Sequence, residues 1–256
     1  MRRNNSLLEL LIKFGARTDQ RTSLGKTAAH FAADSGSVPC LKTLFKHNAD
    51  LTLADNSNYT PLHYASYKGV TCLNIGFPDI VTFIIKKIGK EHILDGNSFS
   101  PIHCAILNQS LDCLKSLIKG LETVPVISDE QGRTPLHLAC SLDDTLIVDA
   151  LIMTGENLNS VDHSGLTPLH VAAKNHNPSI LEFLLASNVD LSMTDNEGNT
   201  ALHIACLEEI EDNALLISKK MSKEQFEIKN KNGKSALDVC KSSDLNWDIS
   251  HIQKTK

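Results

Sequence analysis

Thr134-Pro135-Leu136-His137 is the stretch that determines the fold of this chain, because its pattern recurs along the sequence. Tetrads that begin with Thr or Ser and end with His or Asp stand at 27–30, 60–63, 100–103, 134–137, 167–170, 200–203 and 235–238. Their first residues are separated by 33, 40, 34, 33, 33 and 35 residues. A nearly constant spacing of this size predicts a repeat protein.

Residues around each tetrad keep the same phase. Two positions before the Thr or Ser stands a residue suited to a turn, namely Gly25, Asn58, Ser98, Gly132, Gly165, Gly198 or Gly233. Gly and Asn tolerate a positive φ, so this position predicts the tip of a β-hairpin. The hydroxyl of the tetrad can accept a hydrogen bond from a free helix N–H, and Pro is well placed at the first helical position. We therefore expect a first helix to begin at each tetrad.

Apolar triplets in each repeat predict a second helix. They lie 14, 17 and 18 residues after the tetrad begins, as in Leu114/Leu117/Ile118, Val148/Leu151/Ile152 and Leu181/Leu184/Leu185. This spacing places all three side chains on one helix face. The triplet Ala214/Ile217/Ser218 is weak, so the sixth repeat is expected to fray first. The glycine that ends a first helix at Gly36 and Gly69 is replaced by Gln109, Asp143, His176 and Glu209, which predicts looser helix ends.

A hairpin tip, a helix of the Thr-Pro-Leu-His type and a second helix at a period of 33 residues resemble the ankyrin repeat. The resemblance implies an all-α solenoid of stacked helix pairs with β-hairpin tips. It divides the chain into a partial repeat at 1–26, six repeats at 27–234 and a partial repeat with a tail at 235–256. A loop insertion near 70–78 could be a tolerated loop, a splice artefact or a partner-binding loop. The chain could be a piece of a longer array or an incomplete gene model.

Composition excludes several classes of function. The 25 basic and 30 acidic residues give a net charge of −5, without the basic excess that binding to nucleic acid needs. No run of 18 apolar residues is present, so membrane insertion is not expected. Seven cysteines without a paired CxxC spacing predict reduced thiols in a cytoplasmic or nuclear protein.

The sequence offers little evidence for metal binding or catalysis. The histidines His63, His103, His137, His170 and His203 recur once per repeat, about 10 Å apart for stacked helices. That separation is too large for a zinc site with bonds of about 2 Å, and the resemblance implies that these histidines tie neighbouring loops by hydrogen bonds. Cys104, Cys140 and Cys206 are expected to pack in the core. No nucleotide-binding or metalloprotease motif occurs, so we predict no catalytic residue, no cofactor, no metal and no enzyme activity.

A protein partner is expected on the concave face, which in the ankyrin family is built from hairpin tips and the inner side of the first helix. The candidate partner-binding residues are Tyr59, Tyr67, Lys68, Phe99, Leu107, Arg133, Leu142 and Leu166. Tyr59, Tyr67 and Phe99 are expected to form the centre, because aromatic residues dominate binding hot spots. Alternatively, Tyr59 and Phe99 cover the stem of the neighbouring hairpin and Tyr67 packs against the inserted loop. The C-terminal end of this face is acidic.

A closer likeness comes from residues 59–65, 96–106 and 129–137, whose order is similar to the C-terminal part of the regulatory ankyrin repeat subunits of serine/threonine-protein phosphatase 6. That resemblance implies a non-catalytic scaffold, monomeric by itself, which links a phosphatase catalytic or regulatory subunit to other proteins. Two other classes remain open. One is an inhibitor that masks the basic localisation segment of a transcription factor, which the acidic end would favour. The other is an adaptor that joins a membrane protein to the cytoskeleton.

Overall fold

The computed structural model describes residues 2–67, 77–94, 99–121 and 127–242. The chain divides into two compact units, Met1–Glu130 (unit 1) and Gln131–Lys256 (unit 2). The loop insertion predicted near 70–78 lies outside the described residues, except for Phe77 and Pro78, which open a helix. The described residues contain no helix that is long and apolar enough to cross a membrane.

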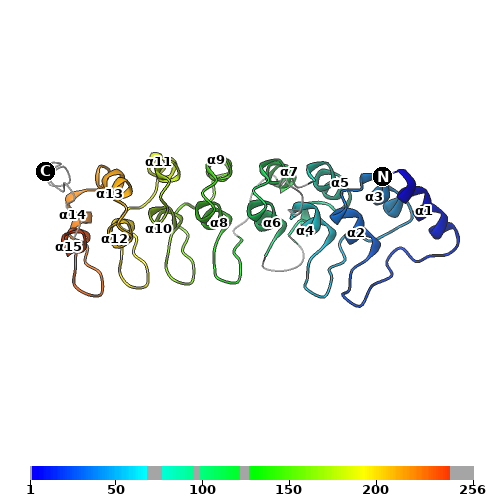
Figure 1. Cartoon of the computed structure of the whole chain (residues 1–256), viewed down its shortest axis with the longest axis horizontal. Coiled ribbons are helices and arrows are strands. Elements are labelled where there is room, and N and C mark those ends of the chain that lie inside the picture. Colours follow the sequence, from blue (N-terminus) through cyan, green and yellow to red (C-terminus); the bar gives the residue numbers. More distant parts are fainter. Residues whose placement is uncertain (1, 68–76, 95–98, 122–126, 243–256) are drawn as a thin grey trace. The chain divides into compact units, whose positions relative to one another are not determined.

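Unit 1 consists of one helix followed by three helix pairs. They are α1 (Arg2–Lys13), α2 (Ala28–Asp34) with α3 (Val38–Lys46), α4 (Pro61–Ser66) with α5 (Pro78–Ile88), and α6 (Pro101–Leu107) with α7 (Leu111–Leu121), and a short 3-10 helix, η1 (Lys90–His92), follows α5. The first helices α2, α4 and α6 stack in one row, and α1, α3, α5 and α7 stack in a second row (Figure 1).

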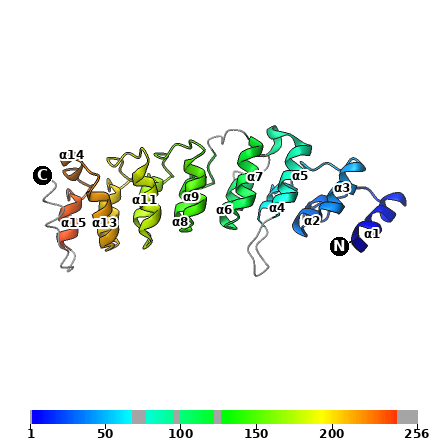
Figure 2. The ribbon, with the colours of Figure 1, turned by 90° about the horizontal axis from the view of Figure 1, so that it is seen from above.

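Unit 2 repeats this arrangement. Its elements are α8 (Pro135–Ser141) with α9 (Thr145–Ile152), α10 (Pro168–Ala173) with α11 (Pro178–Ala186), α12 (Ala201–Leu207) with α13 (Glu211–Ser218), then α14 (Lys223–Phe226) and α15 (Ala236–Ser242). The helices α8, α10, α12 and α15 form one row, and α9, α11 and α13 lie side by side in the other (Figures 1 and 2). The predicted all-α class and the helix start after each tetrad are confirmed.

Each first helix begins where the tetrad predicts, because the tetrad caps it. In α4, Nδ1 of His63 accepts a hydrogen bond from the N–H of Thr60 at 3.0 Å, and Pro61 takes the first helical position. The Thr60 side chain and the His63 side chain together form a capping box. The capping box thus satisfies two N–H groups at the helix start, those of Thr60 and His63, within four residues of sequence.

The predicted β-hairpins are tight turns rather than strands. Asp55 closes one of them: its N–H donates to the carbonyl of Tyr59 at 2.9 Å, and its carboxylate accepts from the N–H of Ser57 at 2.9 Å and of Tyr59 at 3.1 Å. Across the described residues, β pairing is limited to one isolated bridge between Lys229 and Ser235. The N–H groups at the tip therefore bond to the Asp side chain, as in a turn that Asp closes on its own backbone.

Neighbouring turn tips are joined by hydrogen bonds at the repeat spacing. In unit 1, Asn56 donates from its backbone N–H to the carbonyl of Leu24 at 3.0 Å and from its side chain to the carbonyl of Ser23 at 2.9 Å. Gly25 has a φ of +78°, and a Cβ there would overlap the Asn56 side chain. Only glycine therefore allows this close approach between tips.

The ends of the first helices differ in backbone conformation where glycine is replaced. Gly36 adopts a φ of +72°, and Gln109, Asp143 and Glu209 hold the same left-handed conformation at +49°, +61° and +60°. L-residues pay about 1 kcal/mol or more for this conformation. His176, at the equivalent position, does not adopt a positive φ.

The weak triplet of the sixth repeat still faces the core. Ala214, Ile217 and Ser218 are all buried. The buried amide of Asn213 also donates to the carbonyls of Ala173 at 3.2 Å and Asn175 at 2.6 Å. Fraying of this repeat therefore stays a prediction.

One expectation about the cysteines is wrong. Cys206 on α12 and Cys240 on α15 form a disulfide, with their Cα atoms 5.1 Å apart. The stacking of first helices brings the sixth residue after one tetrad start against the fifth residue after the next, a position occupied by alanine in the repeats before it, such as Ala205. The buried thiols of Cys40, Cys104, Cys113 and Cys140 are free.

Candidate functional site

An open, largely apolar pocket with a volume of about 360 Å³ lies between the α4 and α6 segments of unit 1. It is lined by Tyr59, His63, Tyr64, Tyr67, Phe99, Cys104 and Leu107. All three tyrosines of the chain are in this set. The pocket therefore concentrates aromatic surface in a chain with only 5% aromatic residues.

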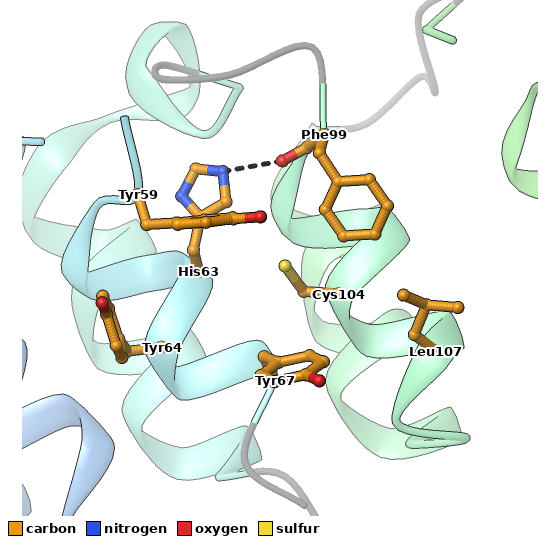
Figure 3. Close-up of a pocket in the computed structure, with 7 residues that line it drawn as sticks. All are labelled: Tyr59, His63, Tyr64, Tyr67, Phe99, Cys104 and Leu107. Atoms are coloured by element: carbon orange, nitrogen blue, oxygen red, sulfur yellow. Dashed lines mark hydrogen bonds between the residues drawn. The ribbon is translucent and has the colours of Figure 1, made fainter. Parts of the chain in front are cut away.

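The aromatic rings surround the opening from several sides. Figure 3 shows the rings of Tyr59 and Tyr67 on opposite sides, with the sulfur of Cys104 between them and Phe99 and Leu107 along the α6 side. Tyr67 caps the C-terminal end of α4, and 57% of its surface is exposed. A ligand side chain could thus enter from solvent and contact several ring faces.

Histidine hydrogen bonds hold the two backbone segments that carry Tyr59 and Phe99. His63 contacts the carbonyl of Phe99 through Nε2 at 3.1 Å, and His30 contacts the carbonyl of Tyr59 in the same way at 3.0 Å. Because Nδ1 of His63 accepts from Thr60, we assign the ring proton to Nε2, which donates to Phe99 (Figure 3). The loop-tying role expected of the tetrad histidines is therefore present at both walls of the pocket.

The same link recurs within unit 2. The Nε2 atoms of His137, His170 and His203 contact the carbonyls of Leu166, Asn199 and Lys234 at 2.8, 3.0 and 3.1 Å. Each of these carbonyls belongs to the residue just before the next tetrad. The repeat thus fixes the backbone at the position that supplies Tyr59, Phe99 and Leu166.

Burial keeps two titratable side chains of the pocket, His63 and Cys104, neutral. Burial lowers the pKa of His63 to about 4, although its hydrogen bond to Phe99 acts in the opposite direction. Burial also raises the pKa of the Cys104 thiol to about 12. Neither a cation nor a thiolate is therefore present on the wall at neutral pH.

Two charged side chains, those of Asp55 and Lys26, contact Tyr64. The Tyr64 hydroxyl donates to the carboxylate of Asp55 at 2.7 Å, and the ammonium of Lys26 lies 4.5 Å from the Tyr64 ring centroid. Burial alone would raise the pKa of Asp55, but the hydrogen bonds from Tyr64 and from the turn N–H groups lower it below its ordinary value. Asp55 is therefore ionised.

Ring contacts hold two of the aromatic side chains against their own helices. Tyr59 packs edge-on against His63, with centroids 5.3 Å apart, and Phe99 stacks on His103 at 5.2 Å. Tyr59 also meets Tyr64 edge-on at 6.4 Å. These contacts fix Tyr59 and Phe99, whereas Tyr67 is the most exposed of the three.

The structure brings together four of the eight predicted partner-binding residues: Tyr59, Tyr67, Phe99 and Leu107. Lys68 lies outside the described residues. Arg133, Leu142 and Leu166 are partly buried in unit 2 and do not line this pocket.

Sequence reasoning missed His63, Tyr64 and Cys104 as lining residues. Tyr64 and Cys104 share one phase, four residues after their tetrads begin, which could have pointed to a common face. Within the described parts of the chain, no group of three or more His, Cys, Asp or Glu side chains could hold a metal ion.

Comparisons with known proteins agree with the repeat. A model described as ankyrin repeats (3 copies) matches residues 1–75 and 69–162, and one described as ankyrin repeats (many copies) matches residues 151–205. The NF-kappa-B p105 subunit of Gallus gallus is 27% identical over 156 residues, which cover 59% of this chain and 15% of that protein. Rabankyrin-5 of Mus musculus is 27% identical over 157 residues, 60% of this chain and 13% of that protein.

The chain thus corresponds to a small part of each of these relatives. Among solved structures, the ankyrin repeat domain of Bcl-3, described as a unique member of the IkappaB protein family, is similar with a TM-score of 0.72 and 23% identity. That similarity covers 90% of this chain and 99% of the Bcl-3 chain. With family models matching most of its length, the chain belongs to the ankyrin-repeat family.

Proposed function

We propose that this chain is a non-catalytic protein-binding scaffold and that its partner docks at the pocket formed by Tyr59, Tyr67 and Phe99. The observation that carries the proposal is the gathering of all three tyrosines around one open apolar pocket. Tyrosine offers large apolar area and a polar tip, and it is enriched in binding hot spots. Rigid aromatic walls beside an exposed Tyr67 are suited to receiving a partner side chain.

The protonation of the lining residues supports binding rather than catalysis. A nucleophilic cysteine needs a thiolate and a general base works best near neutral pH, whereas the pKa of Cys104 is raised to about 12 and that of His63 is lowered to about 4. Both ring nitrogens of His63 are also engaged in hydrogen bonds. These groups support the walls of the pocket.

The class of partner is a separate proposal. The phosphatase 6 scaffold rests on the motif resemblance at 59–65, 96–106 and 129–137. The likeness to an NF-kappa-B subunit and to a domain of the IkappaB protein family favours the second candidate, an inhibitor that masks a basic segment of a transcription factor. Exposed Glu208, Glu209, Glu211 and Asp212 in unit 2 offer the complementary charge. The membrane adaptor is the third candidate.

Affinity purification with three forms of the chain tests the proposal. Wild type, Tyr67→Ala and the control Phe31→Ala are used as baits, since Phe31 is also an exposed aromatic of unit 1 but does not line the pocket. We expect a protein that wild type and Phe31→Ala retain and Tyr67→Ala loses. Recovery of phosphatase subunits, a transcription factor or a membrane protein then distinguishes the three partner classes. Equal recovery with all three baits would rule out docking at this pocket.

A further inference from the structure

The pocket presents ring faces to whatever enters it. Tyr59 and Tyr67 stand on opposite sides of the opening, and Phe99 stands on a third side (Figure 3). The face of an aromatic ring carries the negative part of its quadrupole and attracts cations. Tyr64 of the same set already does so, since the ammonium of Lys26 lies 4.5 Å from its centroid.

Most polar atoms on the wall are already satisfied. Both ring nitrogens of His63 are hydrogen-bonded, and the Tyr64 hydroxyl donates to Asp55. The hydroxyls of Tyr59 and Tyr67 are the remaining acceptors of note. Two hydroxyls cannot satisfy the three N–H donors of a lysine ammonium or the five of an arginine, and buried donors without partners are costly.

Among the described residues, two carboxylates lie near the pocket wall. Tyr59 lies in the field of two carboxylates, those of Asp55 and Glu130. His63 is neutral, and Lys26 and the carboxylate of Asp55 both contact the Tyr64 side chain. A ligand suited to this pocket therefore has a positive charge, apolar contact surface and no N–H donors.

We infer that the pocket binds the trimethylammonium group of a methylated lysine in the partner protein. This inference rests on the proposed docking function. A trimethylammonium group keeps the positive charge of lysine, replaces its N–H donors by methyl groups and is recognised through aromatic faces. The volume of about 360 Å³ is within the range of small-ligand pockets, about 300 to 1,000 Å³.

The test compares three probes of matched shape on the full chain. They are Nα-acetyl-trimethyllysine methylamide, its neutral isostere with carbon in place of the quaternary nitrogen, and the corresponding lysine. Proton NMR follows the methyl signals of the probe and the ring signals of the three tyrosines. We expect upfield shifts of the methyl signals and binding of trimethyllysine that is about fivefold or more tighter than that of either comparison probe.

Variants of Tyr67 separate the contribution of an aromatic ring face to binding from that of apolar surface in general. Tyr67→Leu keeps an apolar side chain but loses the ring face, so the ratio of the affinities for trimethyllysine and the isostere should fall close to one. Tyr67→Phe keeps the ring face and should retain most of the preference for trimethyllysine. Phe31→Leu is the matched control outside the pocket and should leave the preference unchanged. Thermal melts check that each variant is folded, which is expected because Tyr67 is mostly exposed.

The outcomes distinguish this inference from the proposed function. If the isostere binds as tightly as trimethyllysine, or if no probe binds, the methyllysine inference is wrong, while loss of a partner with Tyr67→Ala would still support docking. A basic peptide that carries one trimethyllysine should bind more tightly than choline. If choline binds as tightly as the peptide, the conclusion that the trimethylammonium group comes from a protein is wrong.

Discussion

At the scale of single residues, the tetrad histidine performs two tasks. Nδ1 of His137 accepts from the N–H of Thr134 at 3.1 Å and caps its own helix, and Nε2 donates to the carbonyl of Leu166 at 2.8 Å in the next repeat. Because the side chain is buried, neither Thr134 nor Leu166 could replace the lost bond with bulk water at no cost. One residue therefore couples helix initiation to repeat stacking.

Replacing His137 by Ala should destabilise the protein by about 1 to 3 kcal/mol, because a buried hydrogen bond is removed and its partners are left unpaired. Urea denaturation of the variant measures the free energy of unfolding. His176→Ala, which changes an exposed histidine, is the control and should leave it nearly unchanged. An unaltered unfolding midpoint for His137→Ala would show that the bridge contributes nothing.

The buried histidines also predict acid sensitivity. Burial lowers the pKa of His63 from 6.5 to about 4 and lowers those of His30, His170 and His203. The unfolded chain therefore binds more protons between these values, so the stability present above pH 6.5 is lost as the pH falls toward 4.

His63 alone should cost about 2 kcal/mol at pH 5 relative to pH 7.5. Melting temperatures measured at several pH values between 7.5 and 4.5 check this. The lowered pKa of Asp55 affects stability only at more acidic pH, below its ordinary value of 3.8. A melting temperature that stays constant down to pH 4.5 would contradict neutral buried histidines.

At the scale of elements, the ends of the first helices set local stability. The turn after α12 holds Glu209 at a φ of +60°, a conformation that glycine adopts without strain. The neighbouring Glu208 caps the same helix at an ordinary φ of −85°. The two adjacent glutamates therefore provide a matched pair for measuring backbone strain.

Glu209→Gly should raise the stability by about 0.5 kcal/mol or more, because relief of the left-handed strain exceeds the entropy cost of glycine in the unfolded chain. Differential scanning calorimetry measures the change. Glu208→Gly should instead lower stability, and its weak ion pair with Lys174, 3.9 Å long and exposed, contributes little to that loss. A stabilising Glu208→Gly or a destabilising Glu209→Gly would contradict the argument.

A covalent link joins α15 to its neighbour α12. The disulfide between Cys206 and Cys240 joins α15 to α12, and α15 packs on α12. Cys240→Ala places at this site the residue that the earlier repeats carry there, so it should leave packing intact and remove only the link.

We expect faster amide hydrogen exchange in α15 of the Cys240→Ala variant than in wild type, because among the described helices α15 packs mainly on α12. Exchange in α8 to α11 should not change. A thiol reductant should accelerate α15 in wild type and have no effect in the variant. The four samples are wild type and variant, each with and without the reductant. Equal exchange of α15 in all of them would show that the disulfide adds no stability.

At the scale of the whole molecule, the two units differ in the kind of side chain that they expose. In unit 1 the pocket collects Tyr59, Tyr67 and Phe99 from consecutive repeats. In unit 2 the exposed acidic side chains follow α12.

Tyr67→Ala and Phe99→Ala should each raise the dissociation constant for the recovered partner about thirtyfold. This is the effect of losing about 2 kcal/mol of binding free energy at a hot spot. Calorimetric titration measures the affinity, and a thermal melt checks the fold. Phe31→Ala should bind as wild type does. If both pocket variants melt early yet bind normally at low temperature, the aromatics are structural and the partner binds elsewhere.

The sequence by itself determined the repeat and the helix starts, and the family resemblance implied the histidine links. These depend on short-range chemistry, in which Thr60, Pro61 and His63 cap a helix within four residues, and on a period that stacking must repeat. It also placed Tyr59, Tyr67 and Phe99 on one face through their phase relative to the tetrads.

Only the tertiary structure decided which side chains meet across repeats. Tyr64 and Cys104 join the pocket, and Cys206 meets Cys240, because stacked first helices bring together residues about one repeat apart in sequence. It also decided that the tips are turns closed by side chains such as that of Asp55. Contacts of this kind depend on how closely the helices pack, and residue spacing alone carries no information about that distance.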